Sequence, residues 1–253
     1  MKTAGRADAG TGPRPGRSYG RPEDGLRPVR LERGVMPHAL GSCQVEFGQT
    51  RVLCAATVED GVPGWRQRSH AGWITAEYAM LPCSTQSRSR RETQSRKGRS
   101  MEIERLVGRS LRTVCDLRAL GEYTVTVDCD VLNADGGTLT AAVTGAWVAV
   151  YDALMAWVDA RKIPRLPLVD QVVAVSVGMV DGRLLLDLDY SEDSCAEIDM
   201  NLAYTGGREF VEVQGTGERT PFGRARLDAM LDVAEKGLVE LLDIQARCVG
   251  WGR

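Results

Sequence analysis

The alternation of apolar and polar residues predicts several strands in the first half of the chain. The segments 43–47 and 51–58 are joined by the turn FGQT, which makes them a hairpin. The segments 29–31, 72–80 and 123–132 are strand-like as well. We therefore expect the N-terminal half to build a sheet.

Three longer segments place their apolar residues at helical spacing. A helix that Ser100 can cap and Gly121 closes is predicted from Ile103, Leu106, Val107, Leu111, Val114 and Leu117. The segment 140–158 is long and apolar enough to raise the question of a membrane span. Asp152 near its middle, and the turn before it, favour a buried core helix instead. A last helix follows Phe222.

The remaining strands lie between the second and third helices. Asp181-Gly182, between 171–180 and 183–190, is a strong signal for a two-residue hairpin. Another strand pair flanks Gly206-Gly207, and the proline-rich connection 163–167 is the best boundary between two halves. This order predicts an α+β fold, a mixed sheet with helices against largely antiparallel strands.

Composition narrows the class of protein. The chain has 253 residues, 43% hydrophobic and 26% charged, with a net charge of −2, which is typical of a soluble globular protein. Overall charge does not steer it toward nucleic acid, so binding of a polyanion requires local clustering. We expect residues 1–25, rich in glycine, proline and arginine, to form a flexible arm, and residues 26–253 to form a single domain.

The cysteines and the N-terminus indicate where the protein works. Its seven cysteines include no C-x-x-C pair, and its two histidines lack metal-site spacing, so the sequence predicts neither a disulfide framework nor a structural zinc site. The N-terminus lacks the apolar region of a secretory signal. We expect reduced, mostly buried cysteines in a cytoplasmic protein without a membrane segment.

A glycine turn is the first candidate for chemistry. Residues 133–140 read NADGGTLT, and a Gly-Gly pair before a helix lets backbone amides approach an anion at the positive end of the helix dipole. Thr138 and Thr140 add hydroxyl groups. The alternative is an ordinary strand-to-helix turn with Thr138 as its cap.

A basic run and an acidic run are the other candidates. The segment 84–99 contains no apolar residue; its basic residues are Arg88, Arg90, Arg91, Arg96, Lys97 and Arg99. It suits binding of phosphate or of an RNA backbone, or is a solvated loop.

The segment 187–199 holds six acidic and no basic residues. We expect Asp187 and Asp189 on one face of a strand, with Asp193 and Asp199 across a turn. Such a set can bind Mg²⁺ or act as a general acid, or is a solvated acidic loop.

The motifs together resemble the ribonuclease PH family, which includes polynucleotide phosphorylase and the exosome core subunits. They are GWITAEYAMLP, GRSMEIERLVGRSLR, TVDCDVLNADGGT, LDLDYSEDSCAEIDMN and EVQGTGE, in this order. The resemblance implies a fold of the ribosomal protein S5 second-domain type and a ring-shaped hexamer, a trimer of dimers. It implies phosphorolysis of RNA 3′ ends, chiefly of tRNA precursors and in rRNA processing, with nucleoside diphosphate released and the reverse nucleotidyl transfer.

The resemblance also implies roles for individual residues. Arg99 and the turn Gly137, Thr138, Leu139 and Thr140 would bind phosphate. Asp193 and Asp199 would be catalytic or hold Mg²⁺, and Arg88, Arg90 and Arg91 would contact RNA. The chain departs from the family twice: Leu139 stands where the family has a phosphate-binding arginine, and Cys83 stands where an arginine usually follows Leu-Pro.

These departures leave three functional hypotheses. The first is a phosphate-dependent 3′→5′ exoribonuclease that is impaired by Leu139. The second is a non-catalytic RNA-binding ring subunit. The third is metal-dependent hydrolysis, with water in place of phosphate.

Overall fold

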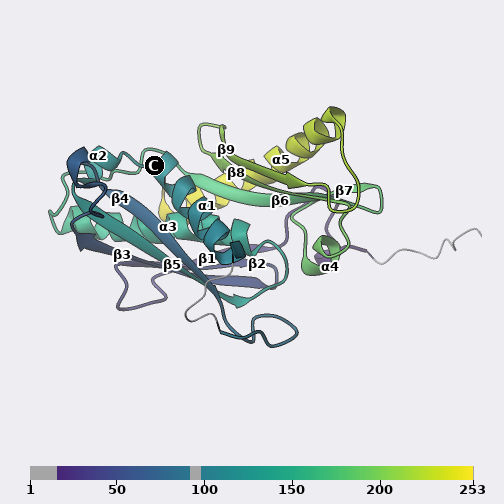
Figure 1. Cartoon of the computed structure of the whole chain (residues 1–253), viewed down its shortest axis with the longest axis horizontal. Coiled ribbons are helices and arrows are strands. Elements are labelled where there is room, and N and C mark those ends of the chain that lie inside the picture. The colour runs from purple at the N-terminus through teal and green to yellow at the C-terminus, as the bar shows by residue number, and fades with distance from the viewer. Residues whose placement is uncertain (1–15, 92–97, 253) are drawn as a thin grey trace, which may run out of the picture.

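Two sheets with helices between and beside them make up the computed structural model, which describes residues 16–91 and 98–252 (Figure 1). The first sheet has the order β1-β2-β3-β5-β4. Its strands are β1 (Val29–Arg33), β2 (Gly41–Phe47), β3 (Thr50–Asp60), β4 (Trp73–Met80) and β5 (Tyr123–Asn133). Phe47 pairs with Thr50, which confirms the predicted hairpin, and β4 runs parallel to β5 while the other pairs are antiparallel.

The second sheet is antiparallel throughout, with the order β7-β6-β8-β9. Its strands are β6 (Val172–Val180), β7 (Arg183–Leu186), β8 (Ile198–Thr205) and β9 (Phe210–Thr216). The two central strands are mostly buried, whereas the edge strand β9 is mostly exposed or half-buried. The expected mixed fold with largely antiparallel strands is confirmed.

Five α-helices lie in the described residues. They are α1 (Gly98–Thr113), α2 (Leu117–Leu120), α3 (Thr138–Asp159), α4 (Tyr190–Asp193) and α5 (Arg224–Val249), with short 3₁₀ helices η1 (Ser18–Gly20) and η2 (Gln67–Ser69). Helices α1 and α3 pack on the first sheet, α3 also packs on β6, and α5 packs on β6 and β7.

The helix α3 is the centre of the core. It is long and apolar enough to cross a membrane by length and composition, but it contacts both sheets and Trp147 is fully buried there. From α5, the Gln245 amide donates to the carbonyl oxygens of Thr144 in α3 and Val172 in β6, both at 3.0 Å. The prediction of a buried core helix is confirmed, and one hydrophobic cluster runs through both halves of the chain.

Three predictions about individual elements are wrong. The helix expected up to Gly121 stops at Thr113, because Asp116 caps the separate helix α2 through the backbone amides of Arg118 and Ala119. Ser100 lies inside the first turn of α1 and is not its cap. The strand expected over 183–190 ends at Leu186, because Asp187 has a left-handed backbone with φ of 54°.

Candidate active site

A cavity of about 460 Å³ lies where the N-terminal ends of α1 and α3 meet the second sheet and α4. The sequence places its walls far apart along the chain. Its lining residues are Arg99, Glu102, Ile103, Gly137, Thr138, Leu139, Ser176, Asp193, Asp199, Asn201, Gln214, Thr216 and Glu218. The cavity therefore brings together the predicted phosphate turn, Arg99 and both predicted catalytic carboxylates.

The Gly-Gly turn forms one wall, and its shape requires glycine. Gly136 and Gly137 have φ of 74° and 65°, in the left-handed region. A Cβ at Gly136 would lie 2.5 Å from the carbonyl oxygen of Leu188. Glycine at this position thus lets the turn pack directly against the acidic segment 187–199.

The same turn starts α3 without a side-chain cap. Gly137 is the N-cap and makes no side-chain capping bond, so Thr138 is the first helical residue and not the cap that the alternative interpretation of this turn required. The Thr138 hydroxyl accepts a hydrogen bond of 2.9 Å from the Tyr78 hydroxyl. The backbone amides of this first turn and the exposed Arg99 in α1 give the wall a positive character.

Leu139 and Thr140 differ in their relation to the cavity. Leu139 is half-buried; it packs against the core and also lines the cavity. Thr140 is fully buried, and its hydroxyl donates to the Gly137 carbonyl oxygen at 2.9 Å. Thr140 therefore supports the turn from behind and is not among the residues that line the cavity.

Two carboxylates with raised pKa values also line the cavity. Burial is the main cause that raises the pKa of Asp199 to about 6, and the neighbouring Asp193 and Glu218 raise it further. Burial also raises the pKa of Asp193, while Arg99 acts in the opposite direction. Asp199 can therefore carry a proton close to neutral pH, which its ordinary pKa would not allow.

The Asp199 carboxylate also has room for a cation. Its Oδ1 atom is buried and has no hydrogen-bond partner among the described residues. Mg²⁺ is commonly bound by one or two carboxylates together with waters and phosphate oxygens. Asp193 and Asp199 fit that pattern, although no group of three or more His, Cys, Asp or Glu in the described residues could hold a metal ion by itself.

The other two candidates of the acidic segment have structural roles. Asp187 is fully buried, and Arg27 donates to both of its carboxylate oxygens, with Nη2 to Oδ1 at 2.7 Å and Nε to Oδ2 at 3.0 Å. Asp189 caps α4 by accepting from the Glu192 amide. The expectation that both lie on one face of a strand is wrong.

Arg27 connects this acidic segment to the glycine turn. Its guanidinium also donates to the carbonyl oxygens of Asp135 at 2.5 Å and Gly136 at 3.3 Å. A buried arginine satisfied on all sides fixes the groups around it, since losing any partner would leave a buried charge unpaired. Arg27 thus joins the glycine turn to the start of the acidic segment.

A second cavity of about 470 Å³ adjoins the first. Both cavities share Arg99, Gly137, Thr138 and Asp193. The second is lined further by Met80, Thr85, Gln86, Ser87, Ala134, Asp135, Gly136 and Tyr190. The shared residues lie where the two cavities meet, so an anion bound there would be accessible from both cavities.

The basic run begins at the edge of this second cavity. Arg88, Arg90 and Arg91 are exposed and line neither cavity, whereas Thr85, Gln86 and Ser87 just before them line the second. Arg96 and Lys97 lie outside the described residues. Cys83 is exposed and is not among the lining residues of either cavity.

Several residues of the cavity were not predicted from the sequence. Asn201, Gln214 and Thr216 project from adjacent strands, with Asn201 paired to Gln214 and Asp199 paired to Thr216. A signal existed in β8, where Asp199 and Asn201 alternate with the buried Met200 and Leu202. Polar residues at every second position of a core strand indicate a wetted face.

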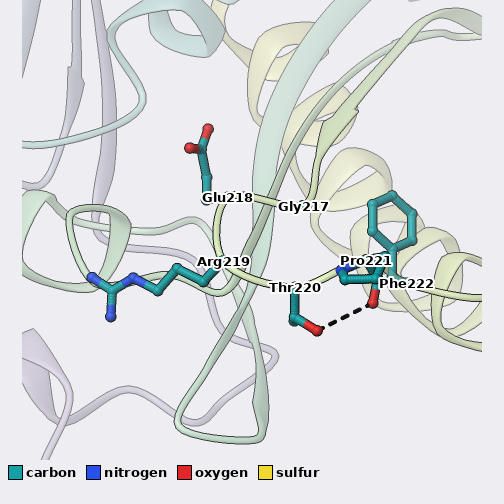
Figure 2. Close-up of a pocket in the computed structure, with 6 residues that line it drawn as sticks. All are labelled: Gly217, Glu218, Arg219, Thr220, Pro221 and Phe222. Atoms are coloured by element: carbon teal, nitrogen blue, oxygen red, sulfur yellow. Dashed lines mark hydrogen bonds between the residues drawn. The ribbon is translucent and has the colours of Figure 1, made fainter.

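Glu218 is the missed residue with the clearest electrostatic effect. It follows β9 on the loop Gly217–Phe222, which encloses a third, more open hollow (Figure 2). Figure 2 shows the side chains of Glu218 and Arg219 leaving this loop in different directions. Glu218 also lines the first cavity and raises the pKa of both Asp193 and Asp199.

Two family models match the chain. The 3′ exoribonuclease family, domain 1, matches residues 25–156, and domain 2 of the same family matches residues 170–237. The chain belongs to this 3′ exoribonuclease family. The gap between the two family matches contains the connection 163–167, which was expected to separate two halves of the chain. The hydrophobic core nevertheless runs through both halves, in keeping with the expectation of a single domain over 26–253.

Named relatives cover nearly the whole chain. A protein of Corynebacterium efficiens named ribonuclease PH is 52% identical over 236 residues, covering 92% of this chain and 96% of its own. The ribonuclease PH of Saccharopolyspora erythraea is 55% identical over 237 residues, covering 92% and 94%. Among solved structures, the Archaeoglobus fulgidus exosome with RNA bound to the active site has a TM-score of 0.76 at 24% identity, covering 89% of this chain and 91% of its own. The family resemblance and its fold are confirmed.

Proposed function

We propose that this protein is a phosphate-dependent 3′→5′ exoribonuclease that also runs the reverse nucleotidyl transfer. One observation carries the proposal: Arg99 and the N-terminus of α3 line the same cavity as Asp193 and Asp199. The arginine and the helix N-terminus suit inorganic phosphate, and the two carboxylates suit a leaving oxygen that needs a proton or a cation. Relatives at 52% and 55% identity named ribonuclease PH support the same activity.

The reaction needs three tasks from these residues. Arg99 and the amides after Gly137 hold inorganic phosphate, whose oxygen forms a bond to the phosphorus of the last phosphodiester. The bond from that phosphorus to the 3′ oxygen of the preceding nucleotide breaks, which releases a nucleoside diphosphate. The leaving 3′ oxygen takes a proton, and charge on the transferred group is stabilised by the positive wall.

The carboxylate pair can meet the leaving oxygen in two ways. Asp199, with its pKa raised to about 6, can donate the proton itself. Alternatively, Asp193 and Asp199 hold Mg²⁺, which would neutralise charge on the phosphoryl and leaving oxygens.

Leu139 gives a specific reason to consider the second hypothesis. Leu139 lines the cavity at the position where the ribonuclease PH family carries a phosphate-binding arginine, so one cationic contact to phosphate is missing. A non-catalytic RNA-binding subunit would tolerate this loss. The retained Arg99, Asp193 and Asp199 in one cavity favour the enzyme.

Incubation with a 3′-extended tRNA separates the hypotheses. The protein is given Mg²⁺ with and without phosphate, and the released nucleotides are identified. Phosphorolysis predicts nucleoside diphosphates that appear only with phosphate. Nucleoside monophosphates without phosphate would indicate hydrolysis, and bound but intact RNA would indicate a non-catalytic subunit.

We propose that RNA reaches the cavity along the basic loop. Replacing Arg88, Arg90 and Arg91 with Ala should weaken RNA binding regardless of sequence and reduce its salt dependence. Each lost phosphate contact lowers the slope by roughly 0.7 on single strands, so the full change is about 2. Fluorescence anisotropy at several salt concentrations measures it.

A matched control removes three exposed charges elsewhere. Arg118, Lys162 and Arg165 are exposed and line neither cavity. Their replacement with Ala makes the same change in net charge and should leave the slope near that of the parent. Equal slopes in all three proteins would show that the basic loop is merely solvated.

We propose a homo-oligomeric ring, a hexamer built as a trimer of dimers. Phe210 and Val213 are 43% and 45% exposed on β9, the edge strand of the second sheet. Exposed apolar residues on a free strand edge commonly mark an interface. Light scattering at micromolar concentration should give six times the chain mass of 27.6 kDa. A mass close to that of one chain would contradict the ring.

The cytoplasm is the proposed location. All seven cysteines are free, and four of them are buried. Thiols that are kept reduced are typical of that compartment.

A further inference from the structure

The N-terminal segment Arg17–Arg21 lies against the acidic segment that carries Asp193 (Figure 1). It falls within the arm predicted to be flexible over residues 1–25, of which residues 1–15 lie outside the described residues. From Arg17 onward the chain is held by side-chain hydrogen bonds. Flexibility was expected because the segment is rich in glycine, proline and arginine, but here its arginines and Ser18 form hydrogen bonds to acidic partners.

Arg17 forms hydrogen bonds to two residues close to Asp193 in the sequence, Glu192 and Leu186. Its guanidinium is bidentate to Glu192, with Nε to Oε1 at 2.7 Å and Nη2 to Oε2 at 2.9 Å. Nη2 also donates to the Leu186 carbonyl oxygen at 2.6 Å. The Arg17 side chain is only 4% exposed, so this pair is shielded from water and is stronger than a surface ion pair.

Ser18 and Arg21 hold the same few residues. The Ser18 hydroxyl donates to Asp189 Oδ2 at 2.8 Å, and Arg21 Nη2 donates to Glu192 Oε2 at 2.9 Å. Arg21 Nη1 donates to the Asp187 carbonyl oxygen at 2.6 Å. Asp189 and Glu192 are the two halves of the capping box that starts α4, so the N-terminal segment binds both capping groups.

The helix that these contacts hold is too short to stand alone. α4 has four residues, and Asp193 is its last. A single helical turn is unstable by itself, because nucleation costs more than one turn of hydrogen bonds returns. The position of Asp193 in the cavity must therefore depend on contacts from outside the helix.

We propose that Arg17, Ser18 and Arg21 form a strap that positions Asp193 for the reaction. This inference rests on the proposed function, since it assigns Asp193 a task in the cavity. Arg17 and Arg21 precede residue 25, where the match to the family model begins. They line neither of the two adjoining cavities, so they act as positioning residues through Glu192 and Asp189.

The test compares full-length Arg17→Ala and Arg17→Lys with a matched control, Arg33→Ala. Arg33 likewise pairs with a carboxylate, Asp152 in α3, and donates to a carbonyl oxygen, that of Cys248 at 3.1 Å. It lines neither cavity. Hydrogen exchange of a peptide over 187–199 is measured together with nucleoside diphosphate release and the melting temperature.

We expect faster exchange over 187–199 and a loss of kcat of roughly 10–100-fold in Arg17→Ala, as a displacement of about 1 Å at a reacting group can cause. RNA affinity and half-saturating phosphate should change little, and Arg17→Lys should recover part of kcat. Arg33→Ala should lower the melting temperature without either effect. If Arg17→Ala fails to fold, Ser18→Ala removes only the bond to Asp189 and should show the same pattern at smaller size.

Two results would overturn the strap. Unchanged exchange over 187–199 in a folded Arg17→Ala would show that the segment does not hold α4. Faster exchange with unchanged kcat would show that it holds α4 without positioning Asp193. Failure of the proposed function looks different, since the parent protein would then release no nucleoside diphosphate while the exchange comparison still reports on the strap.

Discussion

Asp199→Asn should strongly reduce nucleoside diphosphate release and, at neutral pH, make the protein more stable. The amide can neither donate the proton that the leaving oxygen needs nor serve as an anionic ligand for Mg²⁺, so we expect a loss of about 10²–10⁴-fold in kcat. RNA affinity should persist, because the exposed arginines of the basic loop lie outside the cavity. Asp193→Asn should lose activity for the same reason.

The stability change follows from the raised pKa of Asp199. Its value of about 6 lies above the ordinary 3.8, so ionisation of the folded protein is disfavoured, mainly by burial. A group with a raised pKa in the folded state contributes stability that is fully present below its ordinary pKa and is lost as pH rises through about 6. Asn removes the charge, so the variant should gain roughly 1–3 kcal/mol at pH 8 and nothing near pH 3.

Chemical denaturation at several pH values and a kinetic assay measure the two halves of this prediction. Asp232→Asn is the control, since Asp232 is exposed on α5 and lines neither cavity. It should change neither activity nor the pH dependence of unfolding. An active Asp199→Asn protein would remove Asp199 from the mechanism, and a stability difference independent of pH would contradict its raised pKa.

Leu139→Arg should increase phosphate-dependent activity. Leu139 lines the same cavity as Thr138 and the two carboxylates, and Arg99 supplies one cation there already. An added guanidinium can contact phosphate through two hydrogen bonds. A charge-assisted hydrogen bond contributes roughly 1.5–3 kcal/mol, which corresponds to a fall of about 10–100-fold in half-saturating phosphate.

The matched control for this prediction is Leu139→Met. Methionine keeps the size and apolar character of leucine but adds no charge, so the phosphate curve should stay that of the parent. Nucleoside diphosphate release is measured against phosphate concentration in all three proteins, after circular dichroism has shown that each is folded. Coincident curves for the parent and Leu139→Arg would mean that Leu139 does not occupy the place of a missing phosphate ligand.

The strands and long helices were predictable because their signals are local. β2 and β3 alternate around the turn FGQT, and α3 is an apolar run with a glycine turn at its start. The exception is the break between α1 and α2, where Val114 and Leu117 continue the helical spacing. Asp116 accepts hydrogen bonds from two backbone amides of α2 there. The backbone of Cys115 pairs with that of Leu168 in an isolated antiparallel β-bridge, a contact that no local pattern reveals.

Half of the candidate site was also visible in the sequence, through motifs whose chemistry does not depend on neighbours. Arg99, the Gly-Gly turn, Asp193 and Asp199 do line one cavity. The tasks of the other acidic residues were not predictable. Asp187 and Asp193 belong to one acidic run, yet Arg27 neutralises the first, whereas the second lines the cavity.

The sequence alone thus determined which segments become strands and helices and which residue types are available for phosphate and proton chemistry, since periodicity and side-chain chemistry are properties of short stretches. The tertiary structure decided which of those residues meet. Burial and the approach of Asp193 and Glu218 raise the pKa of Asp199, and Arg17 and Arg27 reach acidic partners more than 150 positions away. The dielectric surroundings and the partner of a charge are set by distance in space, and a chain read in order contains no measure of that distance.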